Sequence, residues 1–195
     1  ESFAFADYLQ AFRNRELWKL GAVFACSYAA YIFYSSWSPT FLGKNGVHDA
    51  VVLGLISSAI PAAGILSRPV GGFLAEGRFS RDKRRVPLAA FGILAATSAA
   101  APFLGLGAIP LLIAGGLLAQ MPFTVYYLFS AQILPTRFAG MAYAFMNTIS
   151  LIGGAISPGV AGLLLDVSGS YVAPFAMISL SALIGLGLVL ATRER

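Results

Sequence analysis

The sequence predicts an all-α membrane protein with six transmembrane helices, arranged as two inverted repeats of three helices. Three observations lead to this fold class. The chain of 195 residues is 58% hydrophobic and only 11% charged, too few polar side chains to cover a water-facing surface. Its uncharged stretches reach the roughly 20 residues that a helix needs to cross a bilayer. A short pattern of glycines ending in an acidic residue also occurs twice.

Charged residues mark the ends of the uncharged stretches. These stretches are residues 20–43, 50–67, 86–136, 138–165 and 167–192, and the third is long enough for two crossings. A soluble helical core is the alternative, but its helices would carry polar stripes at the 3.6-residue period, which are missing here. The predicted transmembrane helices are residues 18–42, 50–76, 86–104, 108–133, 139–165 and 171–192, which place the bundle in residues 18–195.

Residues 1–17 differ from the rest, because aromatic side chains alternate with polar ones in a loosely helical rhythm. Two interpretations stay open. The segment is a short helix in the cytoplasmic interface, or it is the end of a linker from a preceding domain. Because the chain lacks an initial Met and a signal-peptide pattern, we expect it to be a fragment or a processed piece.

The distribution of Lys and Arg predicts the orientation. If there are six crossings, the cations before the first span, in the basic segment 78–85, at Arg137 and at the chain's end share one side. Only Lys44 lies on the other side. Since cytoplasmic loops hold the excess of Lys and Arg, both termini are predicted to be cytoplasmic. We expect a multi-pass protein of the plasma membrane.

The same orientation explains the basic segment 78–85 without nucleic acid as a partner, because no aromatic stacking platform accompanies it. Membrane lipid is the expected contact of Lys83, Arg84 and Arg85. The single Cys26 allows no disulfide framework and no zinc site, and no metal or other cofactor is expected.

Two segments match at an offset of 90 residues, AAGILSRPVGGFLAEG (62–77) and IGGAISPGVAGLLLDV (152–167). Each reads as a helix of small residues that ends in Gly-x-x-x-acid. Because the offset covers three helices, the copies cross the bilayer in opposite directions. Glu76 should therefore lie at the cytoplasmic side and Asp166 at the outer side. Inverted repeats of this kind are typical of secondary transporters.

The chain resembles, over essentially its whole length, the C-terminal half of a major facilitator superfamily transporter. In that family a motif G-x-x-x-D-R-x-G-R-R joins the second and third helices of each half, and GFLAEGRFSRDKRR (72–85) fills this place. The match departs from the motif in three ways: Glu replaces Asp, the following Arg is displaced, and the loop glycine is not at its usual spacing. GLLLDVSGSY (162–171) and LPTRFAGMAYAF (134–145) resemble two further loops of the family.

The resemblance implies a secondary active transporter, a symporter or antiporter, that moves a small solute by alternating access. It also implies an N-terminal six-helix half as a partner. The resemblance assigns four residues of this motif to a conformational latch between the halves: Gly72, Glu76, Arg78 and Arg81. Their counterparts in the second repeat are Gly162, Asp166 and Gly169.

In this fold the first helix of each three-helix unit lines the central cavity, so polar side chains there are candidates for binding the solute. The candidates, with two from the fifth span, are Tyr28, Tyr31, Ser35, Gln120, Thr124, Tyr127, Asn147 and Ser150. The alternative is that the tyrosines form an interfacial aromatic belt and the hydroxyl groups bond their own helix backbone.

No Asp or Glu lies in the interior of a span, so we expect no coupling carboxylate in this chain, and the solute is expected to be an organic anion or a neutral metabolite. Arg68 lies within a span, where an isolated cation is costly. It snorkels toward the cytoplasm, or it lines a pathway for an anionic solute.

Other functions fit less well. An intramembrane enzyme would need a Ser–His pair or two acids within the spans, and the only histidine, His48, lies in a loop. We therefore expect no enzymatic activity. The alternative to a transporter half is a six-helix permease subunit or channel that assembles with itself, although the short outer loops offer no selectivity filter.

Overall fold

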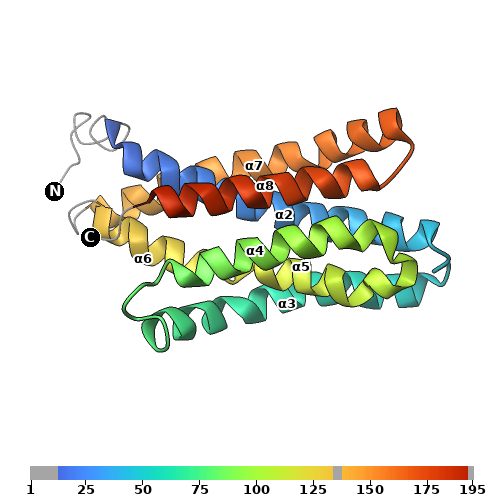
Figure 1. Ribbon diagram of the computed structural model, residues 1–195, viewed down its shortest axis with the longest axis horizontal. Helices are drawn as coiled ribbons and strands as arrows, with labels where there is room; N and C mark the ends of the chain where they lie inside the picture. The colour runs from blue at the N-terminus through green and yellow to red at the C-terminus, as the bar shows by residue number, and fades with distance from the viewer. Residues whose placement is uncertain (1–12, 134–137, 193–195) are drawn as a thin grey trace.

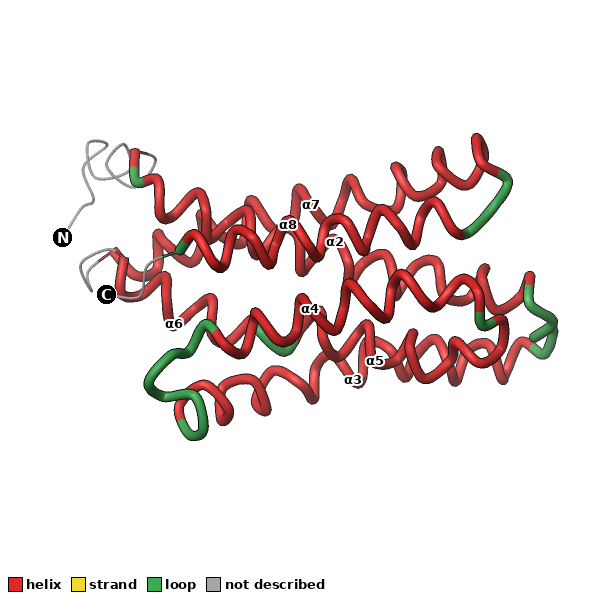
Figure 2. Tube along the Cα trace, in the orientation of Figure 1, coloured by secondary structure: helices red, strands yellow, loops and turns green. Residues whose placement is uncertain are grey.

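The computed structural model describes residues 13–133 and 138–192, which form a bundle of long helices (Figure 1). Six helical segments are long and apolar enough to cross a membrane, and the described residues contain helices and loops but no strand (Figure 2). The prediction of an all-helical protein with six spans is confirmed. The helices are α2 (Arg15–Lys44), α3 (Ala50–Glu76), α4 (Arg85–Ala100), α5 (Ile109–Gln120), α6 (Phe123–Ile133), α7 (Ala139–Ser168) and α8 (Val172–Ala191), with 3₁₀ turns η1 (Ala101–Phe103) and η2 (Gly105–Ala108).

The first helix begins earlier than predicted. α2 starts at Arg15 because the side chain of Asn14 accepts a hydrogen bond from the backbone N–H of Glu16, at 3.0 Å. This contact satisfies one of the free amides of the first turn. The helix or linker predicted for residues 1–17 lies mostly outside the described residues.

Local signals set other helix ends as well. The carboxylate of Asp49 accepts from the N–H groups of Val51 and Val52, which fixes the start of α3. Gly169 ends α7 with a φ of 65°, and its N–H bonds to the carbonyl oxygen of Leu165. Glycine adopts this left-handed conformation without a Cβ clash, so the turn into α8 is tight.

The helices pack as an inverted repeat. α2 makes its most extensive contacts with α7, and α3 makes its most extensive contacts with α5. In the repeat, α2 corresponds to the fourth span (α5 and α6), α3 to α7, and α4 to α8. The α2–α7 and α3–α5 pairings are therefore equivalent. Figure 1 shows the α3–α4 loop at one end of the bundle and the α7–α8 turn at the other. Glu76 and Asp166, near the ends of α3 and α7, thus lie at opposite ends, as predicted.

Single hydrogen bonds repeat in the same way. The indole nitrogen of Trp37 on α2 donates to the carbonyl oxygen of Pro158 on α7, at 3.2 Å. The hydroxyl of Thr124 on α6 donates to the carbonyl oxygen of Arg68 on α3, at 2.9 Å. Arg68 and Pro158 are matched positions of the 90-residue repeat. The two bonds are therefore counterparts at their acceptors, while the donors differ, since the position matched to Trp37 is Tyr127.

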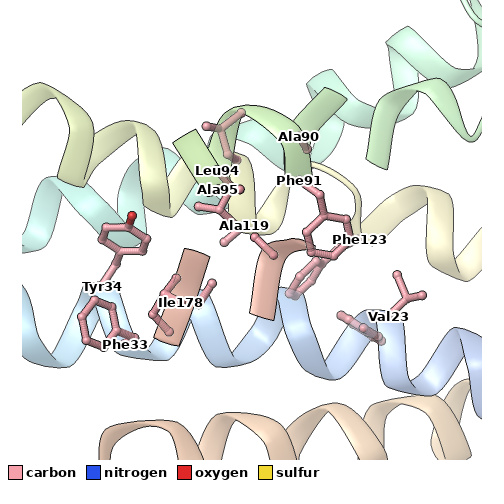
Figure 3. Packing of buried hydrophobic residues seen from close by; sticks show 14 of the residues in the cluster. Val23, Phe33, Tyr34, Ala90, Phe91, Leu94, Ala95, Ala119, Phe123 and Ile178 are labelled. Atoms are coloured by element: carbon pink, nitrogen blue, oxygen red, sulfur yellow. The ribbon is translucent and has the colours of Figure 1, made fainter. Parts of the chain in front are cut away.

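Aromatic and small side chains fill the space between the helices (Figure 3). Buried hydroxyl groups find partners across helices: Tyr34 bonds Ser98 at 2.8 Å, and Tyr126 bonds Ser27 at 2.9 Å. Within a membrane, lipid supplies no hydrophobic drive between helices, so close packing and such hydrogen bonds hold the bundle together.

Two helices keep one broad face uncovered. Within the most apolar 18-residue stretch of each helix, only 17% of α3 and 22% of α7 are buried, whereas 50% of α2 is buried. Large apolar side chains cover these faces, among them Leu66, Phe73 and Leu163. The bundle therefore leaves two apolar helix faces for lipid or another protein to cover.

Candidate functional site

The fourth span is interrupted in its middle. α5 ends at Gln120 and α6 begins at Phe123, because Pro122 has no N–H to donate and its ring displaces the carbonyl one turn earlier. The single helix predicted for residues 108–133 is therefore divided in the structure.

The backbone of α3 comes very close to this interruption at Gly71. A Cβ atom at that position would lie 1.8 Å from the carbonyl oxygen of Met121, so no other residue fits. Its neighbour Gly72, one of the predicted latch residues, also approaches another helix, since a Cβ there would lie 3.1 Å from Cγ2 of Thr124. The preceding glycine is thus the tighter of the two.

Arg68 lies one turn before Gly71 on α3, and its side chain reaches the interruption. Its Nε donates a hydrogen bond to Oε1 of Gln120, and its guanidinium carbon lies 4.9 Å from the ring centroid of Phe123. Both partners are neutral, and Arg68 forms no ion pair with another described residue. A cation is thus held within a span by an amide and an aromatic face.

Gln120 is completely buried between α5 and α3. Its oxygen accepts from Arg68, but its Nε2 has no hydrogen-bond partner among the described residues. A buried amide nitrogen without an acceptor costs free energy of about 1–3 kcal/mol. The side chain therefore keeps donors that an additional acceptor can use.

Aromatic rings connect this group to α2. The ring of Tyr28 lies 6.1 Å from that of Phe123 and 5.9 Å from that of Tyr31, measured between centroids. We call Arg68, Gln120, Phe123, Tyr28 and Tyr31 the arginine cluster. It joins the predicted candidates Tyr28, Tyr31 and Gln120 in one place.

Some predicted candidates use their hydroxyl groups within the bundle. The hydroxyl of Thr124 donates to the backbone carbonyl oxygen of Arg68. Thr124 therefore lies next to the arginine cluster. Ser150 donates to the carbonyl oxygen of Asn147 on its own helix, at 2.7 Å. The hydroxyl oxygen of Ser35 is buried without a partner in the described part of the chain.

The remaining candidates lie away from Arg68. Tyr127, one turn beyond Phe123, packs against Tyr143 of α7 with ring centroids 5.4 Å apart. Asn147 is exposed on α7. Phe123 was not among the residues predicted for the site. The signal that could have found it is Arg68, because an arginine within a span needs partners on a neighbouring helix.

The predicted latch residues lie at the end of the bundle where α2 begins and α8 ends, which we call the terminal end. Glu76, Arg78 and Arg81 are all exposed, and none of them forms an ion pair with another described residue. At the opposite end, the Asp166 carboxylate is exposed, while Gly162 packs near the Trp37 ring.

Arg84, for which the sequence suggested a lipid contact, also has partners within the bundle. Its Nε lies 3.2 Å from a carboxylate oxygen of Asp82, and its Nη1 donates to the carbonyl oxygen of Thr192, at 3.0 Å. Arg84 thus ties the α3–α4 loop to the end of α8. Arg85 also pairs with Asp82, at 3.6 Å.

Comparisons with known proteins agree with this architecture. The family model of the Major Facilitator Superfamily matches residues 1–158. The probable sulfoacetate transporter SauU of Cupriavidus necator is 29% identical over 189 residues, which cover 89% of this chain and 41% of the relative. The nitrite extrusion protein of Bacillus subtilis is 25% identical over 186 residues, covering 92% of this chain and 45% of that protein. The chain spans less than half the length of both relatives.

Proposed function

The chain belongs to the major facilitator superfamily, and on this premise we propose that it is the C-terminal half of a secondary active transporter for a small anion. The transporter works by alternating access, as a symporter or antiporter, and the arginine cluster contributes to its solute site.

The observation that carries this proposal is the neutral surroundings of Arg68. Its guanidinium contacts the amide of Gln120 and the face of Phe123, and no carboxylate of a described residue balances its charge. In a medium of low dielectric constant, such a cation attracts an anion more strongly than it would in water. Arginine also presents a planar fork of donors that matches the oxygens of carboxylates and related anions.

The unused Nε2 of Gln120 supports the same class of solute, because its N–H groups are donors and an anion supplies acceptors. The two relatives add a second line of support, since their names refer to sulfoacetate and nitrite, which are both anions.

The proposed partner is an N-terminal six-helix half. It would cover the apolar faces of α3 and α7, and it would supply the ionic partners that Glu76, Arg78 and Arg81 lack among the described residues, with Gly72 as the fourth latch residue. The latch would hold the halves together at the terminal end in one of the two states of the transporter. The excess of Lys and Arg at this end favours a cytoplasmic location for both termini. The proposed membrane is the plasma membrane.

Uptake by the full-length parent protein in proteoliposomes tests the function. We expect transport of labelled sulfoacetate or nitrite, and a decrease of about 10- to 100-fold when Arg68→Gln removes the charge. Lys44→Gln, at the opposite end from the termini, is the matched control and should transport normally. The melting temperature of each variant separates lost folding from lost binding.

The proposed site fails if folded Arg68→Gln protein transports the anion as the unaltered protein does. An unchanged affinity in Tyr31→Phe or Gln120→Ala would remove that one residue from the site.

A further inference from the structure

A cavity of about 530 Å³ opens at the terminal end of the bundle, apart from the arginine cluster. Its walls come from four elements: the start of α2, the α3–α4 loop, the end of α6 and the end of α8. Figure 1 shows these segments gathered at the same end of the bundle, where α2 begins and α8 ends. None of the residues lining this cavity belongs to the arginine cluster.

Cations from two separate elements line the cavity. Arg15 and Lys19 lie one turn apart at the start of α2, and Arg84 enters from the α3–α4 loop. One acidic side chain, Glu16, shares the lining, and its Oε1 lies 2.8 Å from Nζ of Lys19. Asp82, outside the lining, pairs with Arg84, so Arg15 is the lining cation without an acidic partner among the described residues, and it leaves the lining with net positive charge.

Part of the hydrogen-bonding capacity of these cations remains unused. Arg84 uses its Nε for Asp82 and one N–H of Nη1 for Thr192, which leaves three of its five donors. Arg15 forms no ion pair with another described residue. Arg15 therefore supplies unpaired positive charge from α2, and Arg84 supplies free donors from the α3–α4 loop.

The rest of the lining is mixed. Asn14, Gln132 and Thr192 are polar, whereas Leu20 is buried and Phe129 and Ile133 are half-buried apolar residues. Cations together with an apolar part fit a ligand with an anionic group joined to a less polar part. At the surface of a membrane, acidic phospholipids have this character, and they are drawn to clusters of Lys and Arg.

We propose that this cavity binds a phosphate group, carried by the headgroup of an acidic phospholipid or by a free phosphate. A phosphate has several oxygens and up to two charges, so it can bond Arg84 of the α3–α4 loop together with Arg15 and Lys19 of α2. A carboxylate has two oxygens and one charge and joins the two elements less well. The bound phosphate links α2, the α3–α4 loop and the end of α8.

Thermal melting of the full-length parent protein in lipid nanodiscs tests this site. One series compares pure phosphatidylcholine with phosphatidylcholine containing phosphatidylglycerol, and a second titrates inorganic phosphate in pure phosphatidylcholine. The variant is Arg15→Gln with Lys19→Gln, which spares the contacts of Arg84, and the control is Lys44→Gln. Since each cation near a membrane surface contributes about 1 kcal/mol, we expect the double variant to bind about 30-fold more weakly.

A rise in melting temperature with phosphatidylglycerol alone, lost in the double variant and kept in Lys44→Gln, assigns the site to a lipid headgroup. A rise with inorganic phosphate that the double variant loses assigns it to free phosphate. The proposal is overturned if neither ligand stabilises the unaltered protein, or if the double variant responds as strongly as the control.

Discussion

The indole nitrogen of Trp37 and the carbonyl oxygen of Pro158, 3.2 Å apart, form the counterpart of the bond between Thr124 and the carbonyl of Arg68. Each bond joins the first helix of one repeat to the second helix of the other. The inverted repeat therefore extends from the order of the helices to individual contacts between them.

These counterpart bonds should contribute similarly to stability. Trp37→Phe and Thr124→Val each remove one donor, and each should lower the free energy of unfolding by about 0.5–1 kcal/mol. Because the two bonds share no partner, the double variant should show the sum of the two losses. Thermal or denaturant unfolding of the purified parent protein measures this. A loss in the double variant well above or below that sum would mean that the contacts are coupled.

Gly71 should tolerate no side chain. In Gly71→Ala the added methyl group would overlap the carbonyl oxygen of Met121, so we expect a destabilisation of about 3 kcal/mol and a low yield of folded protein. Gly54→Ala on the same helix is the control, because a Cβ there meets nothing within 4 Å. That variant should be as stable as the unaltered protein or slightly more so. Equal melting temperatures for the two variants would contradict the close approach of α3.

The buried pair Ser27 and Tyr126 should show energetic coupling. Ser27→Ala leaves the Tyr126 hydroxyl without its partner, and Tyr126→Phe does the same to the serine, so each costs about 1–2 kcal/mol. The double variant should cost about 1 kcal/mol less than the sum, since no unpaired group remains. A control cycle with Tyr126→Phe and Ser98→Ala, which do not bond each other, should be additive. Coupling as large in the control cycle would argue against the direct bond.

Glu76 should affect the conformation of the whole transporter more than the stability of this half. It is exposed and makes no ion pair with another described residue, so Glu76→Gln should leave the melting temperature nearly unchanged. If Glu76 contacts the other half, the variant should shift the balance of the two transport states by about 5-fold or more. Accessibility of a single reporter cysteine on each side of the full-length protein measures that balance.

Asp82→Asn is the control for Glu76→Gln, because Asp82 pairs with Arg84 and Arg85 within its own loop. We expect it to loosen the loop without moving the balance of states. Equal shifts in both variants would indicate a general effect of charge in this loop, and the latch would be wrong.

Most of the fold could be predicted because charged residues are costly within a bilayer and so mark the ends of the spans. Residues 50–76 were predicted as a helix, and α3 has these same bounds, since Asp49 caps its start and the charged loop follows its end. The start of α2 was less predictable, because Asn14 extends the helix beyond the apolar stretch.

The site was predictable only in part. A helical face brings Tyr28 and Tyr31 together, and spacing alone shows this. Two partnerships depend on how separate helices meet, which spacing does not contain: Arg68 with Gln120, and Arg84 with the carbonyl of Thr192. The tight contact at Gly71 escaped notice for the same reason, since neighbouring glycines look alike in the sequence.

The division of the fourth span at Met121–Pro122 has a mechanical consequence. A continuous helix resists bending because each sharp bend must break backbone hydrogen bonds. Here the proline has already removed that resistance, next to the arginine that we propose meets the solute. Bending Phe123–Ile133 relative to Ile109–Gln120 therefore breaks fewer backbone hydrogen bonds than bending an unbroken helix would.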